Sequence, residues 1–425
     1  MGMKWLSRIR RRVALALRLA DLHVRSRRMK YKLGLLGRRQ LALTQEIAWL
    51  ETRRRNPMTP ATTGRPVHDA RTGPIWIHAP WRAGSTYVWN KFRSCPQYLA
   101  FYEPFHEALE TVTQAAVASA TATSWPSGHP PLDAPYYHEF EPLLAPGGGV
   151  RGFEHALPYT YYFVNDEPLP QQQAYLNSLV AHAHAAGRRA VFGFCRSTGR
   201  VAWFRRHMPG VHIALTRDGL GLWRSAYGRS QTLGDLYFVT RPLIILLTSR
   251  RDPWIADYLA TLDLDPVPRL SDAGAAQREA ERLAIRDPDL AMRAFAAVFA
   301  LGTALSPRHA DIVMPIEALS TEVGRRSLTA SLAGRFDVAL DWSDCTVPVC
   351  TARAGEESFL DYWHAALRHA EACIPDPHGP AHKPERRNPM PAHPVPGAVC
   401  SPANPPRLIS LKRAPKGGQA LSEGG

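Results

Sequence analysis

PIWIHAPWRAGSTYVW, residues 74–89, is the stretch that decides the fold of this 425-residue chain. Its first six residues, Pro74–Ala79, form an apolar run of strand type, and a tight turn with one arginine and one glycine follows. Two hydroxyl residues, Ser85 and Thr86, then stand where a helix begins. A strand, a turn and a helix N-terminus in this order direct backbone N–H groups and the helix dipole toward an anion. The sequence therefore predicts a phosphate- or sulfate-binding turn here.

Arg82 adds to this turn a planar cation that suits phosphate or sulfate oxygens. The turn is not a Walker motif, because the pattern GxxxxGK followed by Ser or Thr is absent and no lysine stands where one would reach the β- and γ-phosphates. A nucleoside triphosphatase is therefore disfavoured. The alternative interpretation is an ordinary strand-to-helix turn in which Gly84 only permits close packing.

Segments of strand character recur beyond this turn and alternate with segments of helical spacing. The apolar runs are Ala190–Phe194, Val211–Leu215 and Asp311–Ile316, and the helical segments are Leu176–Ala186 and Ser327–Ala333. This alternation predicts an α/β fold around a parallel sheet. The run RPLIILL, within Leu233–Leu270, is compatible with either a strand or a buried helix.

Charge and composition divide the chain into parts. The formal net charge is +15, but residues 1–55 alone carry 16 basic and 3 acidic residues, a net of +13. Residues 56–73 have the composition of a linker, and residues 374–425 form a proline-rich tail that is predicted to be disordered. The folded domain is expected at 74–373. Residues 56–373 have a net charge of only −2, so no nucleic-acid partner is expected for the body.

The N-terminal segment 1–55 is predicted to be a basic helical extension. Leu36, Leu43 and Leu50 recur every seven residues, which is typical of a short coiled coil or an amphipathic helix. Self-association, contact with a membrane surface and a solvated extension without a partner all remain open. No apolar run approaches the length of about 20 residues that spans a bilayer. A cytoplasmic protein, peripheral to the membrane if it touches one, is therefore expected.

Ordered elements of the chain resemble the sulfotransferases that use 3′-phosphoadenylyl sulfate (PAPS). They cover about residues 74–345, and they are most similar to the carbohydrate sulfotransferases and their bacterial relatives. Besides the first turn, the resemblance rests on FYEPFHE at 101–107, FCRSTGRVAW at 194–203, MPGVHIALTRD at 208–218 with Ser225, and DIVMPIEAL at 311–319. The resemblance implies a P-loop-like three-layer sandwich around the central parallel sheet.

The resemblance also implies a donor site. In this family the loop after the first strand binds the 5′-phosphosulfate, which implies donor contacts from Arg82, Ala83, Gly84, Ser85, Thr86 and Tyr87. A strand that ends in Arg-Asp, with a serine eight residues after the arginine, binds the 3′-phosphate, which implies Arg217 and Ser225. The reaction implied is transfer of the sulfuryl group of PAPS to a hydroxyl or amine, with a carbohydrate as the expected acceptor. No metal is expected, since Arg82 and the N–H groups of the turn would stabilise the developing charge.

Deprotonation of the acceptor requires a general base. Glu103 is the first candidate, because the resemblance places it at the edge of the donor site and a carboxylate at the end of the second strand would face the same crevice. His106 is the second candidate, since a neutral imidazole titrates near working pH. Glu154, next to His155, is the third. The alternative for Glu103 is a structural carboxylate that caps a helix or pairs with an arginine.

The chain departs from the family pattern at three places. Arg82 stands for the usual lysine, Ala83 for a common serine, and Gly219 follows Asp218 where proline is usual. A competing Arg-Asp-Pro occurs at 251–253, but position 259 is leucine, so the copy at Arg217 is preferred.

Two other functions remain alternatives: a P-loop-type kinase, and a non-catalytic protein that binds a membrane or nucleic acid through its basic N-terminal helices. Aromatic residues are dense between Trp125 and Phe163 and suit either stacking on sugars or ordinary packing. The main members are Tyr136, Tyr137, Phe140, Tyr159, Tyr161 and Tyr162.

Overall fold

The computed structural model describes residues 72–121, 132–164, 167–249, 253–264, 270, 273–333, 336, 340–345 and 355–374. The predicted N-terminal extension 1–55 lies outside these residues. So do all but the last two residues of the linker 56–73, all but the first of the tail 374–425, and the pair Arg251-Asp252 of the competing motif.

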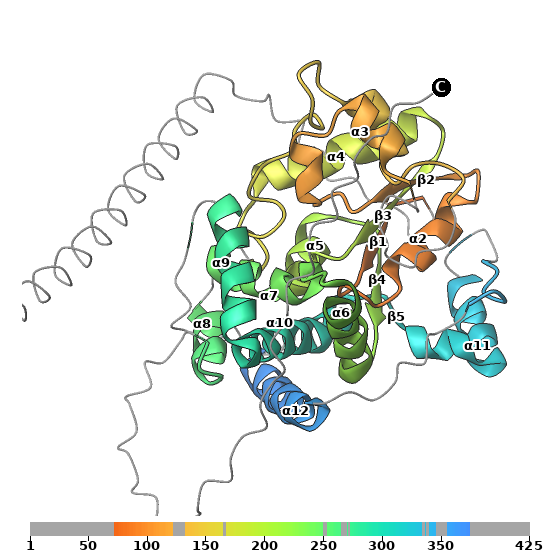
Figure 1. The fold of residues 1–425 in the computed structure, drawn as a ribbon. Helices are drawn as coiled ribbons and strands as arrows, with labels where there is room; N and C mark the ends of the chain where they lie inside the picture. The colour runs from red at the N-terminus through yellow and green to blue at the C-terminus, as the bar shows by residue number, and fades with distance from the viewer. Residues whose placement is uncertain are drawn as a thin grey trace, which may run out of the picture. The chain divides into compact units, whose positions relative to one another are not determined.

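Five parallel strands form the central sheet (Figure 1). They are β1 (Ile75–His78), β2 (Tyr98–Tyr102), β3 (Arg189–Phe194), β4 (Val211–Thr216) and β5 (Ile312–Pro315), in the order β2-β3-β1-β4-β5. The predicted parallel α/β fold is thus confirmed, and each apolar run that the sequence assigned to a strand is one.

Helices occupy the connections between the strands. The α-helices are α2 (Ser85–Arg93), α3 (Gln114–Ser119), α4 (Pro170–Ala185), α5 (Val201–His207), α6 (Gly219–Leu233), α7 (Tyr237–Thr248), α8 (Pro253–Ala260), α9 (Ala273–Arg286), α10 (Pro288–His309), α11 (Glu322–Ala333) and α12 (Glu356–Cys373). Short 3₁₀ turns are η1 (Glu107–Glu110), η2 (His138–Leu143), η3 (Thr198–Arg200) and η4 (Ile316–Ser320). The ambiguous run RPLIILL lies in α7, where every residue from Val239 to Thr248 is buried, as expected for a helix that is apolar all round.

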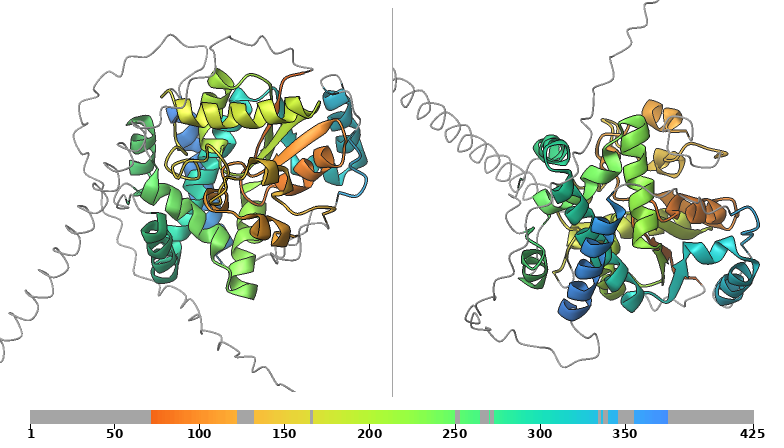
Figure 2. Two further views of the ribbon diagram at one scale, coloured as in Figure 1. Left: turned by 90° about the horizontal axis from the view of Figure 1, so that it is seen from above. Right: turned by 60° about the horizontal axis from the view of Figure 1, so that its bottom comes forward.

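Both faces of the sheet are covered by helices (Figure 2). On one face, Trp89 of α2 lies so close to Gly193 of β3 that a Cβ at that glycine would stand 3.1 Å from the Trp89 Cβ. On the other face, Phe204 of α5 packs on Trp76 of β1, with ring centroids 5.7 Å apart. Because strand side chains alternate, neighbouring residues of one strand pack against different helix layers.

An aromatic row crosses four adjacent strands on the α5 face. Phe101, Phe192, Trp76 and His212 stand at matching register positions, and the Trp76 and Phe192 rings stack with centroids 4.4 Å apart. Next along β1, His78 bonds to Ser197 and His212, and His212 bonds to the Met208 carbonyl. Burial lowers the pKa of His78, with His212 and Arg200 adding to the effect, and it brings that of His212 down to about 4 although Asp311 opposes it, so both imidazoles are neutral at neutral pH.

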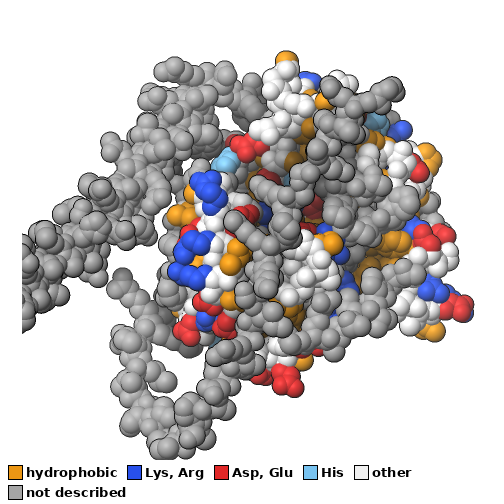
Figure 3. All heavy atoms as spheres, viewed as in Figure 1, with side chains coloured by type: hydrophobic (Ala, Val, Ile, Leu, Met, Phe, Trp, Pro, Cys, Tyr) orange, Lys and Arg blue, Asp and Glu red, His pale blue; other side chains and the backbone are white. Residues whose placement is uncertain are grey.

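Helix α10 is the one described helix long and apolar enough to cross a membrane, and 67% of that apolar window is buried inside the fold. It is therefore a core helix, and it packs on α12 and α7. On the face shown in Figure 3, Lys and Arg side chains gather over α9, where Arg278, Arg282 and Arg286 are exposed at four-residue spacing. The body thus carries a local basic stripe despite its near-zero net charge.

The strand order places β1 at a topological switch point. From β1 the chain first moves outward to β2, returns to β3 beside β1, and then crosses to β4 on the other side. In open parallel sheets the crevice at such a point, outside the carboxyl ends of the strands, is where ligands bind. The residues that follow β1, β2, β3 and β4 are therefore the ones to examine for function.

We predict that Trp76→Ala lowers the free energy of unfolding by about 3–5 kcal/mol, because it removes a buried ring at the centre of the aromatic row. The measurement is urea unfolding followed by circular dichroism. The matched control is Val323→Ala, whose parent side chain is 78% exposed on α11 and whose effect should stay within about 0.5 kcal/mol. Equal effects for the two variants would contradict this assignment of the core.

Candidate functional site

The turn after β1 has the backbone that an anion site requires. Gly84 is the N-cap of α2 with φ +79°, and no side chain caps the helix. The first N–H groups of any helix have no carbonyl partner within it, so here they face the crevice and suit an anion. A Cβ at Gly84 would also stand 2.9 Å from Ile316 Cδ1. Glycine is therefore required both by its φ and by the approach of η4.

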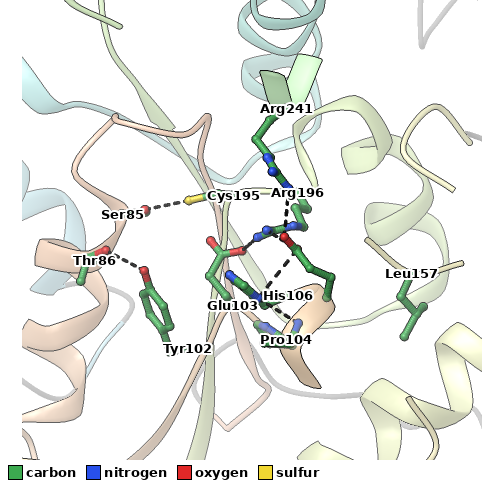
Figure 4. A network of polar contacts seen from close by, with 12 residues as sticks. Ser85, Thr86, Tyr102, Glu103, Pro104, His106, Leu157, Cys195, Arg196 and Arg241 are labelled. Carbon is green, nitrogen blue, oxygen red and sulfur yellow. Dashed lines mark hydrogen bonds and ion pairs between the residues drawn. The ribbon is translucent and has the colours of Figure 1, made fainter. Parts of the chain in front are cut away.

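The hydroxyl groups of the first turn of α2 are engaged within the fold. The Ser85 hydroxyl lies 3.0 Å from Cys195 Sγ, and the Thr86 hydroxyl lies 3.2 Å from the Tyr102 hydroxyl (Figure 4). The Tyr87 hydroxyl donates to Asp344 at 2.6 Å on the far side of the helix. The Tyr87 side chain thus contacts the segment at 344.

The structure brings together Arg82, Arg217 and Ser225, which the sequence predicted as donor ligands. Arg82 Nε donates to Ser225 Oγ at 2.9 Å, and Arg217 Nη1 donates to the Arg82 carbonyl at 2.6 Å. Arg217 is only 9% exposed, and its Nε is buried with no hydrogen-bond partner. A buried donor without a partner is costly unless a ligand satisfies it.

A third arginine, Arg229, belongs to the same cluster. It pairs with Asp235 at 2.9 Å, and the guanidinium groups of Arg82 and Arg229 lie 4.7 and 5.8 Å from the Phe238 ring centroid. Burial and the repulsion of the two other arginines lower the pKa of Arg82 to about 10. Like charges held this close disfavour one another, so a multivalent anion placed among them would be bound strongly.

The departure at Gly219 has a packing reason. Asp218 caps α6 by accepting a hydrogen bond from the Gly221 N–H at 2.9 Å, and its own N–H donates to Glu317 at 3.0 Å. A Cβ at Gly219 would overlap the Trp363 ring of α12. In this chain, helix α12 thus occupies the space that a larger residue at 219 would need.

Glu103 lies directly after β2 and is 3% exposed. Its φ of +46° is an unfavourable conformation for a residue with a Cβ, and such conformations concentrate at functional sites. Its Oε2 accepts from Arg196 Nη1 at 2.6 Å, while Oε1 has no hydrogen-bond partner. Burial raises the pKa of Glu103, and Arg196 and Cys195 oppose that rise. In Figure 4 the second carboxylate oxygen points toward Ser85 and Cys195, which is the side of the anion turn.

Arg196 follows β3 and is fully buried. Besides Glu103, its Nη2 donates to Glu107 at 2.6 Å and to the Tyr237 hydroxyl at 2.9 Å. Glu107 is held in turn by Arg241 Nη1 at 3.0 Å. The result is a continuous series of two carboxylates and two guanidinium groups, Glu103–Arg196–Glu107–Arg241, that extends from the ends of β2 and β3 to α7.

His106 does not have the properties of a base. Its Nδ1 accepts the Ala108 N–H at 3.1 Å and thereby caps η1, while Nε2 lies 3.4 Å from the Tyr237 hydroxyl. Burial lowers its pKa to about 3, with Arg196 and Arg241 adding to the effect and Glu107 opposing it. The third candidate pair, Glu154 and His155, forms hydrogen bonds with residues other than Glu103. The His155 ring bonds to Glu110 at 3.2 Å, and the Glu154 carbonyl accepts a hydrogen bond from the Leu157 N–H.

The aromatic residues predicted either to stack on sugars or to pack are all buried within the fold. This holds for Tyr136, Tyr137, Phe140, Tyr159, Tyr161 and Tyr162. Packing therefore accounts for this cluster. Tyr159 also contacts the charged network, since its hydroxyl accepts a hydrogen bond from Arg241 Nη1 at 2.7 Å.

Four network residues were not identified from the sequence: Arg196, Glu107, Arg241 and Tyr237. Arg196 carried a usable signal, because it is the second residue after an apolar strand that lies next to the first one. Glu107 stood within the quoted motif at 101–107 without a role of its own. Arg241 and Tyr237 lie in the stretch that was ambiguous between strand and helix, so nothing local indicated where they would point.

Comparison of the chain with models of protein families, with curated proteins and with solved structures finds no match in any of the three. Among the described residues, no group of three or more His, Cys, Asp or Glu side chains is arranged to hold a metal ion.

We predict that the His106 imidazole titrates with a midpoint near pH 3, because protonation would place a third cation beside Arg196 and Arg241 in a buried site. The measurement is an NMR titration of the histidine ring signals of the full chain. His106→Asn identifies the resonance by its disappearance, and asparagine retains the ability to cap η1. A midpoint between 6 and 7 would contradict this environment.

Proposed function

We propose that this protein is a PAPS-dependent sulfotransferase with a P-loop-like fold. The observation that carries the proposal is the convergence of Arg82, Arg217 and Ser225, distant in sequence, around the uncapped N-terminus of α2. The parallel sheet supports it, since β1 is central and the turn after β1 lies at the switch point. The ordered motifs that resemble the family supplied these same residues.

The site suits a donor with two separate anionic groups. The N–H groups of the turn 82–87 and the Arg82 guanidinium would hold the 5′-phosphosulfate. Arg217 would hold the 3′-phosphate through its buried, unpartnered Nε. Ser225 accepts from Arg82, so its own proton remains available for a phosphate oxygen. The charge of the cluster opposes the several negative charges of such a nucleotide.

PAPS supplies an activated sulfuryl group on a phosphate leaving group. Arg82 and the helix N-terminus would stabilise charge on the non-bridging and leaving oxygens as the group moves in line to the acceptor. Glu103 would accept the acceptor proton at Oε1, the oxygen that Arg196 leaves unoccupied. Glu103 is preferred over His106 because both ring nitrogens of His106 are engaged and its pKa is low.

The acceptor is proposed to be a hydroxyl of a carbohydrate, on the resemblance alone. A cytoplasmic location, with peripheral membrane contact or self-association through residues 1–55, is part of the same proposal. A P-loop-type kinase is the weaker alternative, because the Walker pattern is absent and the lysine that would reach the β- and γ-phosphates is missing.

We predict that adenosine 3′,5′-bisphosphate raises the melting temperature of the full chain. Arg217→Ala should weaken its binding about 10- to 100-fold, as expected for the loss of a hydrogen-bonded charge contact. The measurement is calorimetric titration, with adenosine 5′-monophosphate as the comparison ligand that lacks the 3′-phosphate. Arg326→Ala, on the exposed face of α11, is the matched control and should bind as wild type does. A folded protein that does not bind the bisphosphate would exclude the proposal.

We predict that Glu103→Gln lowers the rate of sulfuryl transfer by about 10²- to 10⁴-fold while bisphosphate binding is retained, since glutamine keeps the shape but accepts no proton. The assay uses labelled PAPS with a panel of glycans, lipids and small phenols. Full transfer activity in the variant would reject Glu103 as the base.

A further inference from the structure

We propose that Arg196 is a positioning residue that holds the Glu103 carboxylate ionised and aimed at the acceptor, and that Glu107 limits this hold by sharing the same guanidinium. The inference rests on the proposed function and extends it to two residues that the donor motifs do not include. It assigns to Arg196 and Glu107 opposite effects on the same base.

The contacts of Arg196 divide its two terminal nitrogens between two carboxylates. Nη1 lies 2.6 Å from Glu103 Oε2, and Nη2 lies 2.6 Å from Glu107 Oε2. Glu103 is 3% exposed, whereas the Glu107 side chain is 34% exposed. Of the two carboxylates, Glu103 therefore depends more on Arg196, because water cannot solvate it.

Aromatic rings fix the Arg196 guanidinium in place. Its carbon lies 5.1 Å from the Trp81 ring centroid and 5.7 Å from that of Tyr159, and the Tyr237 hydroxyl accepts from Nη2 at 2.9 Å. Trp81 directly precedes Arg82 of the turn after β1. The guanidinium thus links the turn after β1 to Glu103, and it holds Oε2 while the buried Oε1 is not paired with it.

The titratable and charged groups around Glu103 come from every element that packs against it. They are Tyr102 on β2, His106 and Glu107 before and in η1, Cys195 and Arg196 after β3, Tyr137 before η2, Tyr159 in the loop before α4, and Tyr237 and Arg241 on α7. The pKa values of Tyr102, Tyr137 and Cys195 are raised by burial, and that of His106 is lowered. At neutral pH these four are uncharged, so the charges of the network are those of Arg196, which contacts Glu103, and of Glu107 and Arg241, which are joined to Glu103 through Arg196.

The signs of the two effects follow directly. Arg196 is the cation that counteracts the effect of burial on the pKa of Glu103. Without Arg196 this pKa rises, and the carboxyl group stays protonated up to a higher pH. Removing the charge of Glu107 takes away a neighbouring anion and leaves Arg196 to Glu103 alone. The pKa of Glu103 then falls, and the carboxylate becomes a weaker base.

The step that depends on this arrangement is balanced without a further reactant. The acceptor O–H gives its proton to Glu103 Oε1 as its oxygen forms the new bond to sulfur. The bond from sulfur to the bridging phosphate oxygen breaks, and its electron pair leaves with adenosine 3′,5′-bisphosphate. Arg196 contacts neither reacting group and acts through the carboxylate alone.

The test is the pH dependence of kcat/KM for PAPS-dependent transfer by the full chain, with the panel acceptor that wild type sulfates fastest. For Arg196→Met we expect the acid limb to move up by one pH unit or more and kcat to fall at least tenfold. Arg196→Lys should restore much of both. Glu107→Gln should move the limb to lower pH.

Arg93→Met is the matched control. Arg93 forms a comparable buried ion pair with Glu139, at 2.6 Å, but does so at the other end of α2. Its loss should reduce stability and leave the acid limb in place. Circular dichroism verifies that each variant is folded. Two results would overturn the inference. One is an acid limb of the kcat/KM profile at the same pH in Arg196→Met as in Arg93→Met, and the other is a shift of that limb in the same direction in Arg196→Met and Glu107→Gln.

A second readout separates this inference from the proposed function. The protonation of Glu103 is followed by infrared difference spectroscopy, as the carboxyl signal present in wild type and absent in Glu103→Gln. If wild type transfers no sulfate from PAPS, the proposed function fails, and the infrared midpoints still decide the role of Arg196. Opposite shifts for Arg196→Met and Glu107→Gln support it, and unchanged midpoints reject it.

Discussion

The buried ion pair between Arg196 and Glu103 is the interaction on which the crevice depends. Both side chains are almost completely removed from water, and burying a charge is tolerated only when its partners are in place. Those partners come from the turn after β1, the ends of β2 and β3, and α7. The pair therefore requires these four segments to meet, and it couples the position of the anion turn to that of the carboxylate.

Two charged regions with different balances lie side by side around this pair. In the network, Glu103 and Glu107 balance Arg196 and Arg241, so it holds its own charges without a ligand. The cluster of Arg82, Arg217 and Arg229 contains an unpartnered buried nitrogen and a carboxylate on Arg229. Phe238 contacts the cluster while its neighbour Tyr237 contacts the network. The first residues of α7 thus contact both regions. One region is neutral overall and suits proton transfer, and the other is cationic and suits an anion.

Backbone strain marks the same places. Among the described residues other than glycine, Arg82, Glu103 and Asp263 have positive φ, and the first two follow β1 and β2 at the crevice. Each is held by a strong contact: the Arg82 carbonyl accepts from Arg217, and the Glu103 N–H continues the ladder to Gly193. Such backbone conformations persist only where the surrounding structure imposes them. They give the side chains of Arg82 and Glu103 directions that differ from those in a regular strand.

The sequence alone determined the parallel α/β fold, four of its five strands, the turn between β1 and α2, and the spacing of Arg217 and Ser225. These depend on apolar runs, turn residues and separations along the chain, which act among near neighbours. It could not determine that RPLIILL is helical, that His106 is a neutral cap, or that Arg196 links Glu103 to Glu107. Arg196 and Glu103 are 93 residues apart, and their contact exists only once β2 and β3 are aligned. Burial then sets the charge of each group, and burial is a property of the folded chain.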